Sequence, residues 1–211
     1  MYRKVGRTAA AALIATIASA AFASTANAGL LTASATSCDD PALEQPFARW
    51  GDRATYKALG DGGFEANGSG WTFSGGAKVV AGNETYKVGG STDAKSVSLP
   101  SGSSAVSPFT CVGLGEPTLR LFAKRNSALL GLVSTLNVQI QVQTSLGLSL
   151  WLPVLPGDLG GSSWHPTAQM PLIANILPLS VSDKTPVRFR FTPLLGSWQI
   201  DDVYVDPFRN R

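Results

Sequence analysis

The amino-acid sequence predicts an all-β protein, an antiparallel β-sandwich of the jelly-roll type preceded by a cleavable signal peptide. Apolar and polar residues alternate strictly over 136–143 and again over 187–192, which is typical of half-buried strands. Other short apolar stretches follow closely, separated by clusters of Gly, Ser, Asn and Pro that favour turns. No segment after residue 28 has a long helical period.

The first 28 residues have the order of a secretory signal peptide. Three basic residues within the first seven positions are followed by an Ala-rich apolar run over 8–24 and by the small-residue triplet Ala26-Asn27-Ala28. A membrane anchor is the alternative, but this run is short and weakly apolar beside the roughly 20 apolar residues that a spanning helix needs. We therefore predict cleavage after Ala28 and a secreted, extracellular protein.

Charge and length limit the classes of partner. The 211-residue chain has a formal net charge of +3, and the predicted leader carries three basic residues and no acidic one, so the remainder is formally neutral. A neutral chain lacks the clustered Lys and Arg by which proteins hold nucleic acid or anionic lipid, which argues against both partners. Residues 29–211 fit one domain. We expect a flexible N-terminal lead-in over 29–46 and a sandwich over 47–211.

Both cysteines, Cys38 and Cys111, lie in the part predicted to be exported. Exported proteins meet an oxidising environment in which an even number of cysteines usually pairs, so we predict a Cys38–Cys111 disulfide. Two buried free thiols are the alternative. Neither cysteine has the C-x-x-C spacing of metal or redox sites, and we interpret the pair as structural.

Further strands are predicted wherever an apolar stretch lies between turn residues. In chain order they are 71–80, 95–100, 108–112, 118–124, 148–154, 170–177 and 197–205. Pro186 and Pro193 bound the second alternating stretch and are expected to end that strand at both sides. The glycine pairs Gly75-Gly76 and Gly89-Gly90 match no phosphate-binding loop and are expected to form turns.

The last predicted strand has an irregular pattern. Trp198 and Ile200 are apolar at even positions, whereas Val203 and Val205 are apolar at odd positions, so the parity changes at Asp201-Asp202. A β-bulge supplies the extra residue that such a change needs, and burial of both strand faces is the alternative. Because bulges often lie beside functional sites, the acidic pair is of interest.

Histidine-based catalysis is not supported by the sequence. His165 is the only histidine and has no G-x-S-x-G motif beside it, which argues against a serine triad and against histidine zinc sites. We expect His165 at a loop or strand end. Glycoside hydrolysis needs only two carboxylates at a suitable separation. The candidates are Glu65, Glu84, Glu116, Asp201 and Asp202.

Two distant segments resemble the galactose-binding-domain-like jelly rolls, a fold shared by many carbohydrate-binding modules. They are Gly62-Gly63-Phe64-Glu65, followed by Gly70-Trp71, and Trp198-Gln199-Ile200-Asp201-Asp202-Val203. The resemblance implies a structural calcium ion held by Glu65 and Asp201, or by Asp202 instead, together with backbone carbonyls. Oxygen ligands of this kind suit calcium. Turn capping, or pairing with residues such as Arg188 and Arg190, is the alternative role of these acids.

The order of motifs from W-G-D at Trp50 to D-P at Pro207 also resembles a set of short secreted bacterial proteins without an assigned function. This second resemblance covers most of the chain after the leader. It supports the predicted fold and says much less about a ligand.

Glycan binding is the function that the sequence favours, in a non-catalytic domain that recognises an extracellular glycan or cell-wall polymer. Sugar sites stack the apolar faces of sugar rings on aromatic side chains and fix the hydroxyls with a few polar groups. Each candidate for such a platform could instead be a packing residue. The candidates are Trp50, Tyr56, Tyr86, Trp151 and Trp164, whereas Trp71 and Trp198 are assigned to the core.

Two other functions remain as hypotheses. A structural or interaction protein of the cell surface without a small ligand is the second, because the apolar stretch 172–177 is compatible with self-association. An ordinary buried strand explains that stretch more simply. A carboxylate-based glycoside hydrolase is the third hypothesis.

Overall fold

The structure described here is a computed structural model. It describes residues 32–33, 35, 37–38, 41–113, 115–129, 133–144, 146–172 and 184–206. The predicted signal peptide, 1–28, and most of the apolar stretch 172–177 lie outside these ranges. Within them, no helix is long and apolar enough to cross a membrane, and the helical structure includes a short 3-10 turn, Ala48–Trp50.

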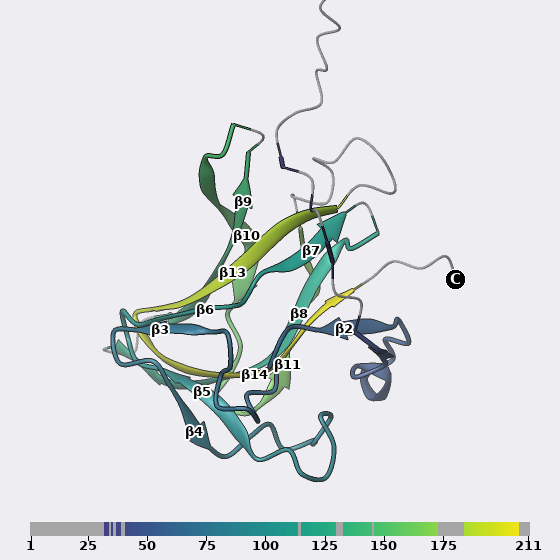
Figure 1. Cartoon of the computed structure of the whole chain (residues 1–211). Helices are drawn as coiled ribbons and strands as arrows, with labels where there is room; N and C mark the ends of the chain where they lie inside the picture. Colours follow the sequence, from purple (N-terminus) through teal and green to yellow (C-terminus); the bar gives the residue numbers. More distant parts are fainter. Residues whose placement is uncertain are drawn as a thin grey trace, which may run out of the picture.

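Two antiparallel β-sheets pack face to face, which confirms the predicted β-sandwich (Figure 1). The eight-stranded sheet consists of β1 (Leu43–Glu44), β2 (Tyr56–Ala58), β4 (Lys78–Ala81), β5 (Lys95–Leu99), β8 (Thr118–Ala128), β11 (His165–Pro166), β12 (Met170–Pro171) and β14 (Gly196–Asp206). The six-stranded sheet consists of β3 (Thr72–Ser74), β6 (Ser104–Val106), β7 (Thr110–Gly113), β9 (Thr135–Gln143), β10 (Ser149–Asp158) and β13 (Lys184–Leu194).

Each sheet is built around one eleven-residue strand. In the six-stranded sheet, β13 pairs with β9 along one side and with β7 and β6 along the other. In the eight-stranded sheet, β14 pairs with β8 along one side and with β5 and β2 along the other. Leu195, at a positive φ of 56°, turns the chain from β13 into β14. Gly196 follows, where an added side chain would overlap the carbonyl oxygen of Ser127.

Most predicted strands are present, but two predictions are corrected. The stretch 71–80 forms two strands in different sheets, β3 and β4, because Gly75 and Gly76 take positive φ values of 61° and 88° and turn the chain. β13 continues through Pro186 and Pro193, which were expected to end it. Each proline has a paired strand on one side only, a position at which a missing N–H is tolerated.

Apolar side chains from both sheets fill the space between them. β9 and β13 contribute every second residue to this core, as their alternation predicts. Trp71 and Trp198, assigned to the core from the sequence, both lie in it. Their indole N–H groups donate to the carbonyl oxygen of Gly60 at 2.8 Å and to the hydroxyl of Ser134 at 2.9 Å. Without such partners, each buried donor would cost about 1–3 kcal/mol.

The change of parity in β14 is a β-bulge, and both faces of the strand around it are buried. The register against β8 shifts between Asp201 and Tyr204, and Asp202 has a positive φ of 49°. Val203 belongs to the main core, whereas Tyr204 belongs to a second cluster. The Val203 amide donates to the carbonyl oxygen of Gly62 at 3.2 Å, so a loop lies against the bulge. The two alternatives drawn from the sequence are therefore both realised.

A second cluster of aromatic residues packs outside the main core, against the eight-stranded sheet. Its buried members are Phe47, Ala54, Tyr56, Phe122, Trp164 and Tyr204. The described part of the expected lead-in, 29–46, is attached to the sandwich, because β1 pairs with β2 and Cys38 is bonded to Cys111. The outer face of the six-stranded sheet has no comparable aromatic cover among the described residues.

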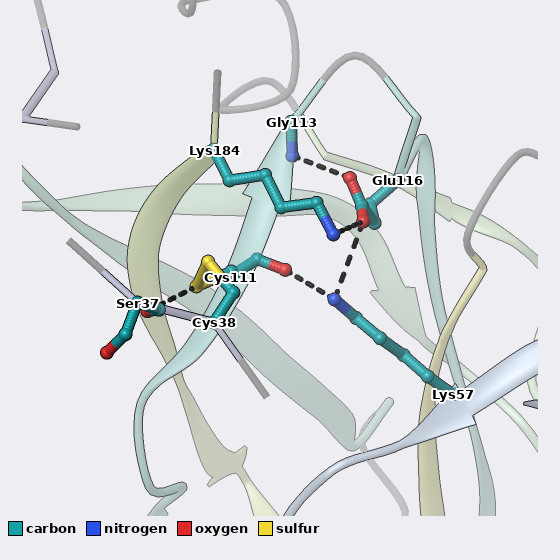
Figure 2. Close-up of a disulfide and its surroundings, with 7 residues drawn as sticks. All are labelled: Ser37, Cys38, Lys57, Cys111, Gly113, Glu116 and Lys184. Atoms are coloured by element: carbon teal, nitrogen blue, oxygen red, sulfur yellow. Dashed lines mark hydrogen bonds and ion pairs between the residues drawn. A yellow bond between two sulfur atoms is a disulfide. The ribbon is translucent and has the colours of Figure 1, made fainter. Parts of the chain in front are cut away.

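The predicted disulfide is present, and a buried charge network lies beside it (Figure 2). The Cα atoms of Cys38 and Cys111 are 5.7 Å apart. Lys57 Nζ donates to the carbonyl oxygen of Cys111 at 2.5 Å and lies 3.5 Å from a carboxylate oxygen of Glu116. The same oxygen is 3.2 Å from Lys184 Nζ. The network therefore links β2, β7 and β13 around the disulfide.

Removing the disulfide should destabilise the fold. The bond joins residues with a sequence separation of 73, and closing a loop of that length removes about 4 kcal/mol of chain entropy from the unfolded state. We expect Cys38→Ser/Cys111→Ser to lower the free energy of unfolding by roughly 2–4 kcal/mol in urea denaturation. The reduced wild type is the control and should match the variant. A variant as stable as the oxidised protein would contradict the structural role.

Candidate functional site

The outer face of the six-stranded sheet carries two rows of polar and aromatic side chains. The strand register aligns Trp151 of β10 with Gln141 of β9 and Arg188 of β13, and the second row contains Pro153, Gln139 and Arg190 of the same strands. Successive side chains of a strand point to opposite faces, and the residues between the two rows, such as Ile140 and Phe189, lie in the core. The two rows therefore point away from the core.

The glutamines hold the arginines in place. Arg188 Nε donates to Gln141 Oε1 at 2.6 Å. Arg190 donates to Gln139 Oε1 through Nε at 2.9 Å and through Nη2 at 2.6 Å. Since both arginines are only half-buried, their remaining N–H groups are available to a ligand.

Aromatic rings flank the two arginines. The guanidinium carbon of Arg190 lies 4.2 Å from the centroid of a Trp151 ring, and that of Arg188 lies 5.0 Å from the ring of Phe109. Both distances lie within the roughly 6 Å range of cation–π attraction. Phe109 is 59% exposed and also lines a depression of about 760 Å³ beside the disulfide, with Pro186 of β13 in the same lining. The two rows of side chains on the outer face therefore lie next to a hollow in the surface.

Of the five aromatic residues predicted to bind a ligand, Trp151 alone lies on this face. Trp50, Tyr56, Tyr86 and Trp164 belong to the second cluster, where the rings of Trp50 and Tyr86 meet edge to face at 4.7 Å. Tyr56 is fully buried, its hydroxyl donates to a carboxylate at 2.6 Å, and Trp164 is 8% exposed. Tyr56 and Trp164 are corrected to packing residues, because neither offers an open ring face to a sugar.

Three buried carboxylates meet at the β14 bulge. One oxygen atom from each of Glu84, Asp93 and Asp202 lies within 4.8 Å of the others. Glu84 and Asp93 belong to the connection between β4 and β5, whereas Asp202 belongs to the bulge itself. Asp93 Oδ1 and Asp202 Oδ2 are buried without a hydrogen-bond partner, and no ion pair found within the described ranges involves the three acids.

The sequence predicted Glu65, Asp201 and Asp202 as metal ligands, and the structure brings one of them, Asp202, into this acidic cluster. Asp201 accepts two backbone amides, including that of Glu84 at 3.0 Å. Glu65 accepts the two backbone amides at the start of β5 at 2.8 and 2.7 Å. Asp201 and Glu65 therefore hold in place the backbone segments that bear the carboxylates of the acidic cluster.

Burial disfavours the charged forms of the clustered acids. Burial, followed by the charge of Glu84, raises the pKa of Asp93 to about 6. Burial, followed by the charges of Asp93 and Glu84, also raises the pKa of Asp202. Burial acts in the same direction on Glu65, but the hydrogen bonds from backbone amides outweigh it and hold the pKa of that carboxyl below its ordinary value. A divalent cation would offset the repulsion, and an all-oxygen donor set fits calcium.

Some residues of the acidic cluster and of the outer face of the six-stranded sheet were not predicted from the sequence. Glu84 was considered only as a catalytic carboxylate, and Asp93 was not considered. The face on the six-stranded sheet has a readable signal, because the outward positions of two alternating stretches hold only amide, hydroxyl and guanidinium side chains. They are Asn137, Gln139, Gln141, Gln143, Arg188, Arg190 and Thr192. An ordinary solvated face would mix Lys and Glu among them.

His165 begins the short strand β11 and pairs with Asp158. Its Nε2 lies 2.8 Å from Asp158 Oδ2, and its Nδ1 lies 2.9 Å from the carbonyl oxygen of Ser163. Both partners only accept hydrogen bonds, so the two contacts together require the doubly protonated imidazolium. The hydrogen bond to Asp158 raises the pKa of His165.

This ion pair predicts a pH-dependent contribution to stability. Because folding raises the pKa of His165, the contribution is fully present below the ordinary pKa of about 6.5 and is lost as the pH rises through the folded value. We expect His165→Gln to lower the free energy of unfolding by roughly 1 kcal/mol or less at about pH 5.5, and by less at about pH 9. Asp158→Asn should show the same pH dependence in urea denaturation, and a pH-independent loss would contradict the imidazolium assignment.

No family model matches the chain, and no curated protein matches it. Its neighbours among solved structures include several carbohydrate-binding modules and the enzymatically active domain of tailspike protein 4 of bacteriophage CBA120. One is the CBM22-1 and GH10 part of the Clostridium thermocellum endo-1,4-β-D-xylanase 10B complexed with xylohexaose, at 16% identity and a TM-score of 0.49, covering 74% of this chain and 28% of that chain. Another is a xylan-binding domain from CBM22, at 15% identity and a TM-score of 0.42, covering 76% and 99%.

A third neighbour is TmCBM61 in complex with β-1,4-galactotriose, at 18% identity and a TM-score of 0.39, covering 71% of this chain and 97% of that chain. Structural similarity at TM-scores below 0.5 does not identify the ligand of this chain. The chain also spans only 28% of the xylanase fragment. The function of this protein must therefore be inferred from its own side chains.

Proposed function

We propose that the protein is a secreted, non-catalytic domain that binds an extracellular glycan on the outer face of the six-stranded sheet. The observation that carries the proposal is the alignment on one open face of the partly exposed Trp151 with the half-buried Arg188 and Arg190. Stacking surfaces beside a few convergent polar groups are what sugar sites require. The leader pattern of residues 1–28 and the disulfide support an extracellular location.

Binding would use the two kinds of group together. A sugar ring would lay its apolar C–H face on the exposed part of the Trp151 ring, while its hydroxyls accept hydrogen bonds from the free guanidinium N–H groups. The side chains lie on paired strands and are joined by hydrogen bonds to Gln139 and Gln141. Because they are already ordered, little conformational entropy is lost on binding.

The other two hypotheses have less support in the described residues. The apolar stretch invoked for self-association begins at Leu172, which is buried, and continues outside the described ranges. Among the carboxylates considered for hydrolysis, Glu84 and Asp202 are buried within the acidic cluster. Glu116 is buried between two lysines. These surroundings suit ion pairing or cation binding better than a sugar substrate.

The proposal predicts that Trp151→Ala strongly weakens glycan binding without unfolding the protein. Loss of the stacking ring should weaken affinity at least tenfold, about 1.4 kcal/mol, in affinity electrophoresis against a panel of soluble plant and microbial polysaccharides. Leu129→Ala, which removes a 52% exposed apolar side chain just after β8, is the matched control and should bind as the wild type does. Unchanged binding by Trp151→Ala, or no binding by the wild type to any polysaccharide, would overturn the proposal.

We propose separately that Glu84, Asp93 and Asp202 hold a structural calcium ion. The two buried carboxylate oxygens without partners support the proposal, because an ion would satisfy both at once. Glu84 and Asp93 come from the connection between β4 and β5, so the ion would fasten this connection to the β14 bulge. The acidic cluster belongs to the eight-stranded sheet, and the ion would have no direct part in glycan binding.

Calcium should raise the midpoint of thermal unfolding, by about 2.7 kcal/mol of stability at 100 times its dissociation constant. Asp202→Asn should abolish this increment, because one of the three carboxylate ligands is lost. Asp61→Asn is the control, since Asp61 caps an exposed turn outside the acidic cluster and should leave the increment unchanged. A wild type that does not respond to calcium, or an equal response in Asp202→Asn, would refute the site.

A further inference from the structure

The proposed glycan-binding face carries two positive charges that no described residue neutralises. Across the described ranges, Arg188 and Arg190 form no ion pair, and the side chains that alternate onto this face include no Asp or Glu. The pairing of these arginines with Glu65 or Asp201, considered from the sequence, is not formed. Those acids lie beside the eight-stranded sheet and accept backbone amides.

Three other buried or half-buried cations among the described residues have carboxylate partners, whereas half-buried Lys95, Lys124 and Arg125 form no ion pair there. Arg120 lies 2.7 Å from Asp52, and Lys57 and Lys184 share Glu116 at 3.5 and 3.2 Å. Lys184 belongs to the same strand as the two unpaired arginines, β13. Partial burial of a guanidinium without a counter-charge costs free energy, so the two arginines are positions where an external anion would be stabilising.

The free donors of these arginines are held ready for such an anion. A guanidinium has five N–H donors in a planar fork. Gln141 occupies one donor of Arg188 and Gln139 occupies two of Arg190, and the Trp151 ring supports the guanidinium of Arg190. Alternate residues of a strand are about 7 Å apart, so the two forks lie side by side on one face.

We infer that the glycan is acidic and that its uronate carboxylates bind to Arg188 and Arg190 while its sugar rings stack on Trp151. This inference rests on the proposed glycan-binding function and names the class of glycan. A carboxylate is planar and matches the guanidinium fork with two parallel hydrogen bonds. In a uronic acid the carboxylate is attached directly to the sugar ring. A sugar ring stacked on the Trp151 indole would therefore place its carboxylate at the level of the guanidinium that is stacked on the same indole. A sulfate ester is tetrahedral and is carried further from the ring.

The test compares uronate polysaccharides with their neutral counterparts. We expect wild-type protein to bind at least one of polygalacturonate, alginate and glucuronoxylan at least tenfold more tightly than its carboxyl-reduced form in isothermal titration calorimetry. Affinity should fall as salt is added. Arg188→Gln and Arg190→Gln should each weaken binding about tenfold or more, because a charge-assisted hydrogen bond is lost. Arg190→Lys retains the charge without the fork and should recover only part of the affinity.

Arg53→Gln is the matched control, because Arg53 is an exposed arginine outside the sheets and should not affect binding. Equal weakening by Arg53→Gln would overturn the inference, since binding would then depend on overall charge. Equal binding of acidic and carboxyl-reduced polysaccharides, lost in Trp151→Ala, would overturn the acidic assignment and leave the proposed function standing. Binding to sulfated galactans alone would overturn the uronate assignment. No binding to acidic, neutral or sulfated polysaccharides would overturn both.

Discussion

Burial of β14 on both faces is the constraint on which the rest of the structure depends. A strand of a two-layer sandwich usually needs one covered face, but this strand has the main core on one side and the aromatic second cluster on the other. The bulge makes both possible, because it keeps Val203 in the main core while Tyr204 enters the second cluster. Loops must then fold over the outer side of the eight-stranded sheet. In the described structure, the open sheet face is therefore that of the six-stranded sheet.

The sequence predicts those strands that are buried on one face and continuous. Strict alternation records one-sided burial directly, which is why β9 and β13 were predicted, and the shift of parity in β14 records the bulge in the same way. Strands of two or three residues, such as β1, β2 and β11, are too short to show a period. The stretch 71–80 reads as one strand by its apolar residues, but Gly75 and Gly76 allow it to cross between sheets.

Candidate sites were harder to predict than strands because they depend on tertiary neighbours. Tyr56 has a polar residue on each side in the sequence and Trp151 lies between two leucines, yet Tyr56 is enclosed by the segments that cover the eight-stranded sheet and Trp151 is left on an open face. Asp201 and Asp202 are adjacent, but the bulge directs Asp202 to the acidic cluster and leaves Asp201 to accept backbone amides. When a side chain contacts residues about 100 positions away in the sequence, its adjacent residues do not predict those contacts.

The acidic cluster and the arginines of the open face also show how a chain that is formally neutral over residues 29–211 can hold two regions of charge without an ion pair among the described residues. The carboxylates of the acidic cluster belong to the eight-stranded sheet and the unpaired arginines to the outer face of the six-stranded sheet, so the apolar core lies between them. Opposite charges on separate sheets of a sandwich cannot form hydrogen-bonded pairs. The proposed calcium ion would stabilise the acidic cluster, and the proposed acidic glycan would stabilise the two arginines on the open face. The same sandwich that separates the charges thus separates the two proposed sites, with the ion on the covered sheet and the polymer on the open sheet.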